Sequence, residues 1–281
     1  LDASEVDNTD YVCNGIDGGD SAVLVNIEHE YLCFNDDGQR IESGLDENGN
    51  GVLEASEVTS VDYAFCREDQ MIAWVNQIGA PPQDYARDMV VDTDGNVIVV
   101  GYTYGDLGAP NQGGIDVFVA KFDSDGNVAW ISQWGGPSFE SAEAVWVDDA
   151  GEIYVTGYAS TGSVFGPALG SLDAFLIKVR ADGSMAWSTQ LGSSGAEYGY
   201  GVVVDSVGNI YVAGYTNGVV GSTNFGDYDV YLSKFDSSGW PLQSFPWGST
   251  ARDEVFGLSI DSADNVLIGG STTGSFFSAN Q

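Results

Sequence analysis

Short stretches in which apolar and polar residues alternate recur along the chain from residue 71 onward. They are rich in β-branched and aromatic residues, and Asp-Gly or Gly-Asn pairs separate them. Period-two alternation is typical of strands that bury one face, and these dipeptides favour tight turns. The pattern predicts an all-β fold whose strands, in one part of the chain, cover residues 128–133, 142–147, 152–157 and 174–179.

The strand pattern belongs to an internal repeat. The segment Asp-Gly-Asn-Val-Ile-Val-Val-Gly-Tyr-Thr at 94–103 returns in related form at 150–159, 207–216 and, more loosely, 263–272. Its glycines are spaced 56, 57 and 56 residues apart: Gly101, Gly157, Gly214 and Gly270. Units of four short strands with this period indicate β-propeller blades, which stack because none can bury both faces alone.

The expected blades cover residues 71–127, 128–184, 185–240 and 241–281. The last unit has no counterpart of residues 229–235. The propeller therefore looks truncated, and we expect the natural polypeptide to continue.

The repeat resembles a known bacterial family. Its pattern is Trp…Gly-Gly…Ala…Val-Asp…Gly-Asn-Ile-Tyr-Val-Ala-Gly-Tyr-Thr…Asp-Val-Tyr-Leu-Ser-Lys-Phe-Asp, which is similar to the SBBP β-propeller repeat over about residues 71–281. The resemblance implies a propeller in a large secreted or surface protein, and it implies no particular catalytic activity.

Residues 46–57 match an EF-hand-type calcium loop. Gly51 allows the sharp turn that such a loop needs, and Glu57 stands at the position of the bidentate ligand. Hard oxygen ligands in this order favour calcium over zinc or copper. The alternative is a Gly/Asn-rich turn that matches by chance. The predicted ligands are Asp46, Asn48, Asn50, the carbonyl of Val52, Glu54 (directly or through water) and Glu57.

The N-terminus repeats part of this loop, because Leu1–Glu5 parallels Leu53–Glu57. Residues 1–13 are therefore interpreted as the tail end of one module, and residues 14–70 as a complete one. The pattern over about 14–66 resembles a calcium-loop module found in tandem in bacterial surface proteins, in a family of unknown function. The resemblance implies a small disulfide-bonded module ahead of the propeller.

The same resemblance implies a disulfide between Cys33 and Cys66, with Cys13 paired upstream. The alternative pair is Cys13–Cys33, which leaves Cys66 free. Either bridge implies an oxidising compartment, so we expect an extracellular or cell-surface protein.

The charge balance limits the partners. Asp and Glu number 42 against 8 Lys and Arg, which gives a net charge of −34. Such a surface repels nucleic-acid backbones and anionic membranes, and it attracts cations. No apolar run is long enough to cross a bilayer. Calcium is the expected cofactor.

The repeats lack the histidine that a Ser-His-Asp or Cys-His nucleophilic system needs. The sole histidine is His29, outside them, and all three lysines share one repeat position, which indicates a structural role: Lys121, Lys178 and Lys234. A pair of carboxylates would suffice for a glycosidase, and Glu143, Glu197 and Glu254 are among the acids that break the repeat. On balance, we expect no enzymatic activity.

The loops before the second strand of each expected unit are the expected binding face, with a solvated acidic rim as the alternative. Its candidate residues are Tyr85, Phe139, Glu140, Tyr198 and Asp253. The favoured function is that of a calcium-stabilised extracellular structural or adhesive protein, such as a fibre or matrix component within a longer polypeptide. The alternatives are a lectin-like propeller and, less favoured, a polysaccharide-degrading enzyme. Expected partners are copies of the chain itself, or surface glycans and proteins.

Overall fold

The computed structural model describes residues 23–28, 38–45, 58–65 and 74–275, with side chains from Trp74 onward. The chain divides into two compact units, Leu1–Ala73 and Trp74–Gln281. In the first unit an antiparallel sheet has the order β1 (Val23–Glu28), β2 (Gly38–Leu45), β3 (Val58–Phe65). The calcium-loop segment 46–57 and the three cysteines lie outside the described residues.

The second unit begins with a four-stranded antiparallel sheet in which consecutive strands are neighbours. We call it the first sheet. Hairpins join its strands, as the Asp-Gly and Gly-Asn turns predict. Its strands are β4 (Asp84–Val91), β5 (Val97–Thr103), β6 (Asp116–Phe122) and β7 (Val128–Trp134).

Two more sheets repeat this arrangement, and a two-stranded sheet follows them. The second sheet consists of β8 (Glu140–Val147), β9 (Ile153–Ser160), β10 (Leu172–Val179) and β11 (Met185–Leu191). The third consists of β12 (Glu197–Val204), β13 (Ile210–Thr216), β14 (Asp229–Phe235) and β15 (Pro241–Trp247). The fourth contains β16 (Asp253–Ile260) and β17 (Val266–Thr272). The expected all-β fold with antiparallel four-stranded sheets is confirmed.

The sheets divide the chain at other points than the expected blades. Strand β7 starts at Val128, the expected start of a new unit, yet it pairs with β6 of the first sheet. In the same way β11 pairs with β10, and β15 with β14. A periodic sequence fixes the length of a unit but not its starting strand, and the hairpin pairing decides that.

An aspartate stabilises the turn between the first and second strands of each sheet in the second unit. Asp92 Oδ1 accepts hydrogen bonds from the backbone N–H groups of Asp94 and Asn96, at 3.0 and 2.8 Å. Gly95 takes a φ of 80° there, which glycine adopts without strain. Lys121 lies 2.9 Å from Asp92. Although burial opposes it, the hydrogen bonds from Asn96 and Lys121 lower the pKa of Asp92 to about 2. These residues are structural, as their repetition predicts.

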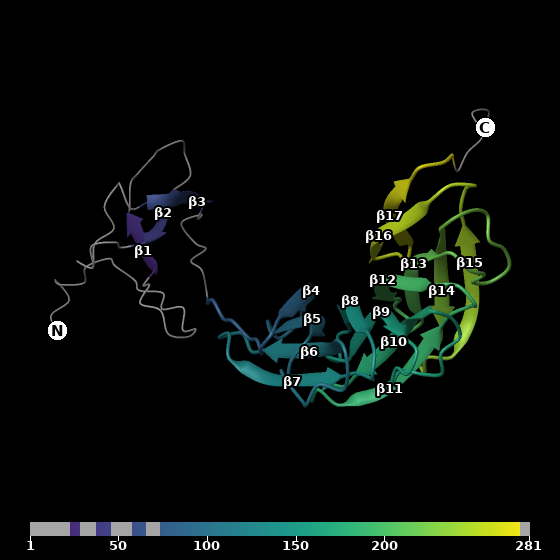
Figure 1. Ribbon diagram of the computed structural model, residues 1–281, viewed down its shortest axis with the longest axis horizontal. Coiled ribbons are helices and arrows are strands. Elements are labelled where there is room, and N and C mark those ends of the chain that lie inside the picture. Colours follow the sequence, from purple (N-terminus) through teal and green to yellow (C-terminus); the bar gives the residue numbers. More distant parts are fainter. Residues whose placement is uncertain (1–22, 29–37, 46–57, 66–73, 276–281) are drawn as a thin grey trace. The chain divides into compact units, whose positions relative to one another are not determined.

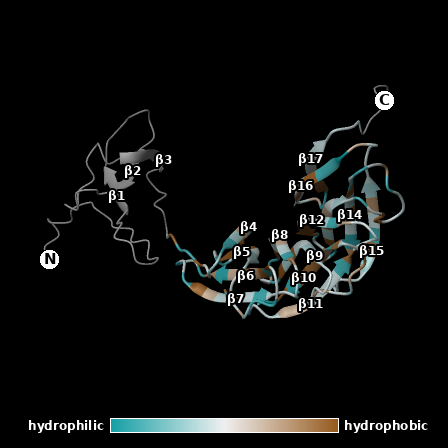
Figure 2. Ribbon diagram, in the orientation of Figure 1, coloured by the Kyte–Doolittle hydropathy of each residue, from teal (hydrophilic) through white to brown (hydrophobic). Residues whose placement is uncertain are grey.

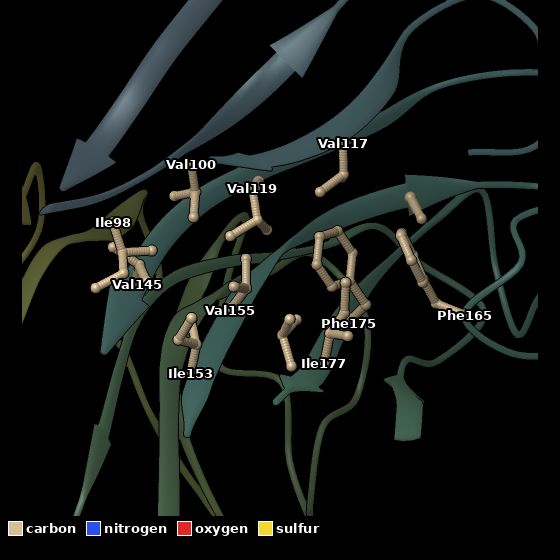
Figure 3. Close-up of a cluster of buried hydrophobic side chains, with 13 residues drawn as sticks. Ile98, Val100, Val117, Val119, Val145, Ile153, Val155, Phe165, Phe175 and Ile177 are labelled. Atoms are coloured by element: carbon tan, nitrogen blue, oxygen red, sulfur yellow. The ribbon is translucent and has the colours of Figure 1, made fainter. Parts of the chain in front are cut away.

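The core lies between neighbouring sheets. Val117 and Val119 of the first sheet belong to one buried cluster with Phe175 and Ile177 of the second (Figure 3). A second cluster joins the second sheet to the third, and a smaller one joins the third to β16 and β17. The hydrophobic segments, brown in Figure 2, lie within these strands. The second and third sheets, which have a neighbour on each side, thus bury both faces by stacking.

First strands of neighbouring sheets contact one another: β4 with β8, β8 with β12, and β12 with β16. In the second unit these strands line the concave side of a curved row of sheets, and β7, β11 and β15 lie on the convex side (Figure 1). One side of the second unit is therefore built from the first strand of every sheet.

On the convex side, a tryptophan fastens the first sheet to the second. Trp130 of β7 donates from Nε1 to the carbonyl of Ala181, in the β10–β11 turn of the second sheet, at 3.1 Å. Its ring lies where a side chain on Gly183 would have to go. Trp74 makes the equivalent bond to Ser124, at 3.1 Å. Trp130 is thus a structural contact between two sheets, and Trp74 holds the segment before β4 on the first sheet.

Replacing Trp130 should weaken the stack. We expect Trp130→Ala to lower the free energy of unfolding by about 2–3 kcal/mol, because the ring is half-buried and its hydrogen bond crosses between sheets. Urea unfolding measures the loss. Val128→Ala, at an exposed position of the same strand, should cost less than about 0.5 kcal/mol. Equal losses for both variants would contradict the role of Trp130.

Candidate functional site

A β-bulge recurs in the first strand of every sheet in the second unit. The pairing register shifts at the same repeat position each time, between Ala86 and Asp88 in the first sheet and between Ala142 and Ala144 in the second. A bulge leaves one residue without a cross-strand partner and re-aims its side chain, and bulges are frequent beside functional sites. The residues at the bulges differ in chemistry: Arg87, Glu143, Tyr200 and Phe256.

A glycine next to each bulge brings two backbones together. A Cβ on Gly214 of β13 would lie 1.7 Å from the carbonyl oxygen of Tyr198 on β12. The equivalent distances are 1.9 Å at Gly101 and at Gly157. Only glycine fits such a position, which explains why this glycine recurs in every repeat.

The bulge residues of the first two sheets form an ion pair. Arg87 Nε lies 3.6 Å from Glu143 Oε2. Glu143 Oε1 accepts a 2.6 Å hydrogen bond from the hydroxyl of Ser141. The Arg87 guanidinium also lies 5.1 Å from the centre of the Tyr102 ring, a cation–π distance. The carboxylate and the guanidinium therefore neutralise each other at this end of the site.

Tyrosines continue the site across the second and third sheets. The rings of Tyr158 and Tyr198 are 5.0 Å apart and meet edge to face, although 40 residues separate them. Tyr200 stacks on Tyr215 at 5.3 Å, and Tyr215 contacts Tyr228 at 5.4 Å. Such contacts fix the orientation of each ring.

At the far end a second arginine lies on the tyrosines. The Arg252 guanidinium is 4.6 Å from the centre of the Tyr228 ring and 6.0 Å from that of Tyr215. It forms a 2.6 Å ion pair with Glu254 on β16. Both ends of the site thus carry an arginine that is paired with a glutamate and packed on a tyrosine.

We call this surface the tyrosine band. It extends across all four sheets of the second unit, with members on β4, β5, β8, β9, β12, β13 and β16 and in the loops before β14 and β16. Its side chains range from half-buried to exposed, with Tyr215 nearly covered. Its members are Tyr85, Arg87, Tyr102, Glu143, Tyr158, Tyr198, Tyr200, Tyr215, Tyr228, Arg252 and Glu254.

The band is rich in neutral hydrogen-bonding groups. Burial raises the pKa of Tyr102, Tyr158 and Tyr198 above 10, so these side chains stay phenols at neutral pH. Burial also raises the pKa of Glu143, against the opposing effects of Ser141 and Arg87. Aromatic faces, phenol hydroxyls and paired charges can bind a ligand by stacking and by hydrogen bonds.

Of the predicted binding-face residues, the structure brings Tyr85 and Tyr198 into the band. Tyr85 is 41% exposed and stacks on Tyr102 at 4.9 Å. Phe139 is exposed in the loop that precedes β8. Glu140 and Asp253, however, are each 0% exposed, so a ligand cannot touch them in this conformation.

Glu140 and Asp253 are buried for a structural reason. Each stands at the start of a first strand and accepts a hydrogen bond from a backbone N–H group four residues earlier, that of Gly136 at 2.9 Å and that of Ser249 at 2.6 Å. In the sequence these two acids suggest a solvated rim, but in the structure they hold the loops that precede β8 and β16.

Of the four bulge residues, only Glu143 is singled out from the sequence. Their signal was nevertheless there: they stand three residues after the repeated acid of each first strand, at a position where the repeat changes chemistry. Arg87, Tyr200 and Phe256 could have been found by that criterion, and Glu143 did stand out as a repeat-breaking acid. Tyr228 and Arg252 lie in loops and gave no such signal.

The predicted calcium ligands all lie in 46–57, outside the described residues, as do Cys33 and Cys66. Where the structure is described, no group of three or more His, Cys, Asp or Glu residues could hold a metal ion. Over the same residues, no helix has the length and apolar character needed to cross a membrane.

Family comparisons match three segments, which together make up less than half of the chain. Residues 73–108 and 186–218 match the SBBP beta-propeller repeat, which confirms that part of the resemblance. Residues 24–66 match a domain of unknown function, DUF7151. That match gives no evidence of an EF-hand-like calcium loop.

Two curated proteins are similar over about half of the chain or more. Regulatory protein FlaEY of Caulobacter vibrioides is 28% identical over 183 residues, which is 59% of this chain and 19% of that protein. WD repeat-containing protein L264 of Acanthamoeba polyphaga mimivirus is 23% identical over 190 residues, 53% of this chain and 14% of that protein. The chain thus spans less than a fifth of either relative.

Three solved structures match most of the chain but share little sequence with it. A luciferin-regenerating enzyme is 13% identical, with a TM-score of 0.36 over 89% of this chain and 64% of that one. A GH43_12 protein from a capybara gut metagenome is 12% identical, with a TM-score of 0.37 over 90% and 48%. The extracellular domain of a one-component system from B. thetaiotaomicron is 11% identical, with a TM-score of 0.32 over 94% and 32%.

The expectation that the chain has no enzymatic activity is corrected by these structures. They include a luciferin-regenerating enzyme and a GH43 glycoside hydrolase, so enzymes are among the structural neighbours and the exclusion does not stand. At 12–13% identity and TM-scores of 0.36 and 0.37, these matches assign no reaction to this chain.

Replacing the glycine beside a bulge tests whether the close approach of β12 and β13 positions the band. We expect Gly214→Ala to lower the free energy of unfolding by about 2–3 kcal/mol or more, because its Cβ would meet the Tyr198 carbonyl and push β12 from β13. Denaturant unfolding measures this loss, and the near-ultraviolet circular dichroism of the tyrosines should weaken.

Gly269→Ala on β17 is the matched control, because its Cβ would meet nothing within 4 Å. This variant should unfold within about 0.5 kcal/mol of the unaltered chain. If Gly214→Ala behaved in the same way, the close approach of β12 and β13 would not constrain the band.

Proposed function

We propose that this chain is the recognition part of an extracellular, adhesive β-propeller protein and that it binds its ligand along the tyrosine band. One observation carries the proposal: the same bulge in every first strand presents a different side chain on one side of the stacked sheets. The bulge is the same in every first strand, but the residue at the bulge differs. Such an arrangement suits a binding surface with a constant scaffold and specific contacts.

The chemistry of the band favours an uncharged ligand, and among the expected partners it favours a glycan. Arg87 and Arg252 are each paired with a glutamate, so neither offers a free positive charge to an anion. The net charge of −34 also repels anionic ligands. Stacking on tyrosine faces, with hydrogen bonds to phenols and carboxylates, is what a neutral sugar needs.

The calcium loop and the disulfide enter this proposal from the sequence. Calcium held by 46–57 and a bridge between Cys33 and Cys66 would stiffen the module that precedes the propeller, as suits a protein exposed outside the cell. The net negative charge makes bound calcium favourable for the compact state. In this proposal the chain is one stretch of a longer surface polypeptide.

A glycan array tests the band directly. The chain should retain a defined set of uncharged glycans, and Tyr200→Ala should weaken binding by about tenfold or more, because it removes a stacked ring at a bulge. Trp240→Ala is the control: this tryptophan is 70% exposed in the β14–β15 turn, outside the band, and its loss should leave binding unchanged.

Three outcomes would count against this proposal. Loss of binding in the Trp240→Ala variant as well would point to nonspecific aromatic contacts. If the chain retained no glycan on the array, glycans would be ruled out as its ligands. Turnover of a bound glycan that stops in Glu143→Gln would make the chain a hydrolase, since glycosidases act through carboxylates.

Thermal unfolding with calcium and with a chelator tests the loop. Calcium at a hundred times its dissociation constant should stabilise the chain by about 2.7 kcal/mol. Asp46→Ala combined with Glu57→Ala should abolish that shift. Asp123→Ala, in an exposed turn without a closing glutamate, should retain it. No shift for the unaltered chain would leave the loop as a simple turn.

A further inference from the structure

Two buried glutamates occupy equivalent positions in neighbouring sheets. Glu140 begins β8 and Glu197 begins β12, and both are 0% exposed. Through Oε2, each accepts a backbone hydrogen bond from four residues earlier, Glu140 from Gly136 at 2.9 Å and Glu197 from Ser193 at 2.7 Å. The remaining oxygen of each carboxylate decides how well the charge is compensated.

Glu197 has donors for that second oxygen. Its Oε1 accepts hydrogen bonds from the hydroxyl of Ser193 and from the hydroxyl of Thr216, both at 2.6 Å. The Oε1 of Glu140 has no hydrogen-bond partner among the described residues. A buried carboxylate without donors is costly to ionise.

The difference has a clear origin in the sequence. Ala159 lies opposite Glu140 in the β8–β9 pairing, where Thr216 lies opposite Glu197. Gly136 stands where the other sheet has Ser193. A side chain at Gly136 would come within 2.4 Å of the carbonyl oxygen of Gly162, so a serine cannot stand there without a backbone shift. Both hydroxyl donors are therefore missing at Glu140.

A second carboxylate adds to the cost. Asp116, at the start of β6 in the first sheet, is 0% exposed, and its charge acts on Glu140. Asp116 Oδ2 accepts hydrogen bonds from the Gln112 backbone and the Gln133 side chain at 3.0 and 2.9 Å, and its Oδ1 has no partner. Among the described residues, Asp116 is the charged group whose effect raises the pKa of Glu140.

We propose that Glu140 is a proton-binding contact at the junction between the first and second sheets, and that its ionisation loosens this junction. The proton neutralises one of two buried carboxylates and gives the unpartnered Oε1 a hydrogen to donate. Glu197 has both hydroxyl donors, so it stabilises the equivalent position of the third sheet in its ionised form.

The direction of the pH effect follows from the titration of Glu140. Burial, followed by the charge of Asp116, raises its pKa from 4.5 to about 7, against the opposing effect of the Gly136 hydrogen bond. The folded chain thus keeps this proton at pH values where the unfolded chain has lost it. The stability that the proton provides is complete below pH 4.5 and is lost as the pH rises through 7.

The junction and the tyrosine band share strand β8. Glu140 and the bulge residue Glu143 share β8, and the backbone N–H of Val145 on that strand donates to Asp88 of β4 at 2.9 Å. Loosening at Glu140 would therefore disturb the β4–β8 contact that brings Arg87 to Glu143. The proton contact does not depend on what the band binds.

The experiment compares urea unfolding of the full chain, Glu140→Gln and Glu197→Gln from pH 4.5 to pH 8 at constant ionic strength. The ratio of the unfolding constants of the unaltered chain and Glu140→Gln should rise on the order of 100-fold over this range, because the amide cannot ionise. Glu197→Gln should not relieve the loss of stability at pH 8, since its carboxylate is already compensated.

A second variant distinguishes the loss of the proton from a general disturbance of the packing at Glu140. Ala159→Thr supplies the hydroxyl that Thr216 supplies at the next junction, and it should reduce the pH dependence while the glutamate remains. The infrared carbonyl band of a protonated carboxyl group, followed against pH, should disappear near neutrality and be weaker in Glu140→Gln at pH 5. A pH dependence that is the same in the unaltered chain and Glu140→Gln, or the same infrared band in both, would overturn the proposal.

Discussion

The structure of the second unit depends on the stacking of sheets that are apolar on both faces. Val117 and Val119 of the first sheet meet Phe175 and Ile177 of the second, and no single sheet could bury either set alone. The spacing of the repeat follows from this constraint, because each unit must supply one whole sheet. The tryptophans of the convex side and the turn glycines that receive them hold the same stack from its outer edge.

Stacking also creates a surface to which all four sheets of the second unit contribute their first strands. The first strands contact one another, and a bulge in each presents one side chain beside the next. Tyr158 and Tyr198 meet there at 5.0 Å, and Arg87 reaches Glu143 from another sheet. The band is therefore a property of the stack and of no individual repeat.

The same junctions bury carboxylates, which an apolar stack tolerates only where donors meet them. Glu197 has such donors in Ser193 and Thr216, and Glu140 lacks them. One backbone frame thus yields two junctions with different proton chemistry. Repeats that look alike in sequence differ in what their neighbours provide.

The sequence by itself determined the strands, the turns and the repeat length, because alternation, Asp-Gly turns and recurring glycines act through local backbone geometry. The recurrence of the lysines also predicts their structural role, since a group that recurs in every unit serves the unit. The propeller repeat is confirmed in two segments, whereas the calcium loop, the disulfide and the adhesive role stay predictions.

Only the tertiary structure decided which strands share a sheet and which side chains face a ligand. Strand β7 begins where a new unit was expected, yet it closes the first sheet. Glu140 and Asp253 looked like exposed acids and are fully buried, while Arg87 and Tyr200 lie in the band. The physical reason is that spacing along the chain sets local conformation. The environment of a side chain, in contrast, is set by the sheet that packs against it, often 50 residues away.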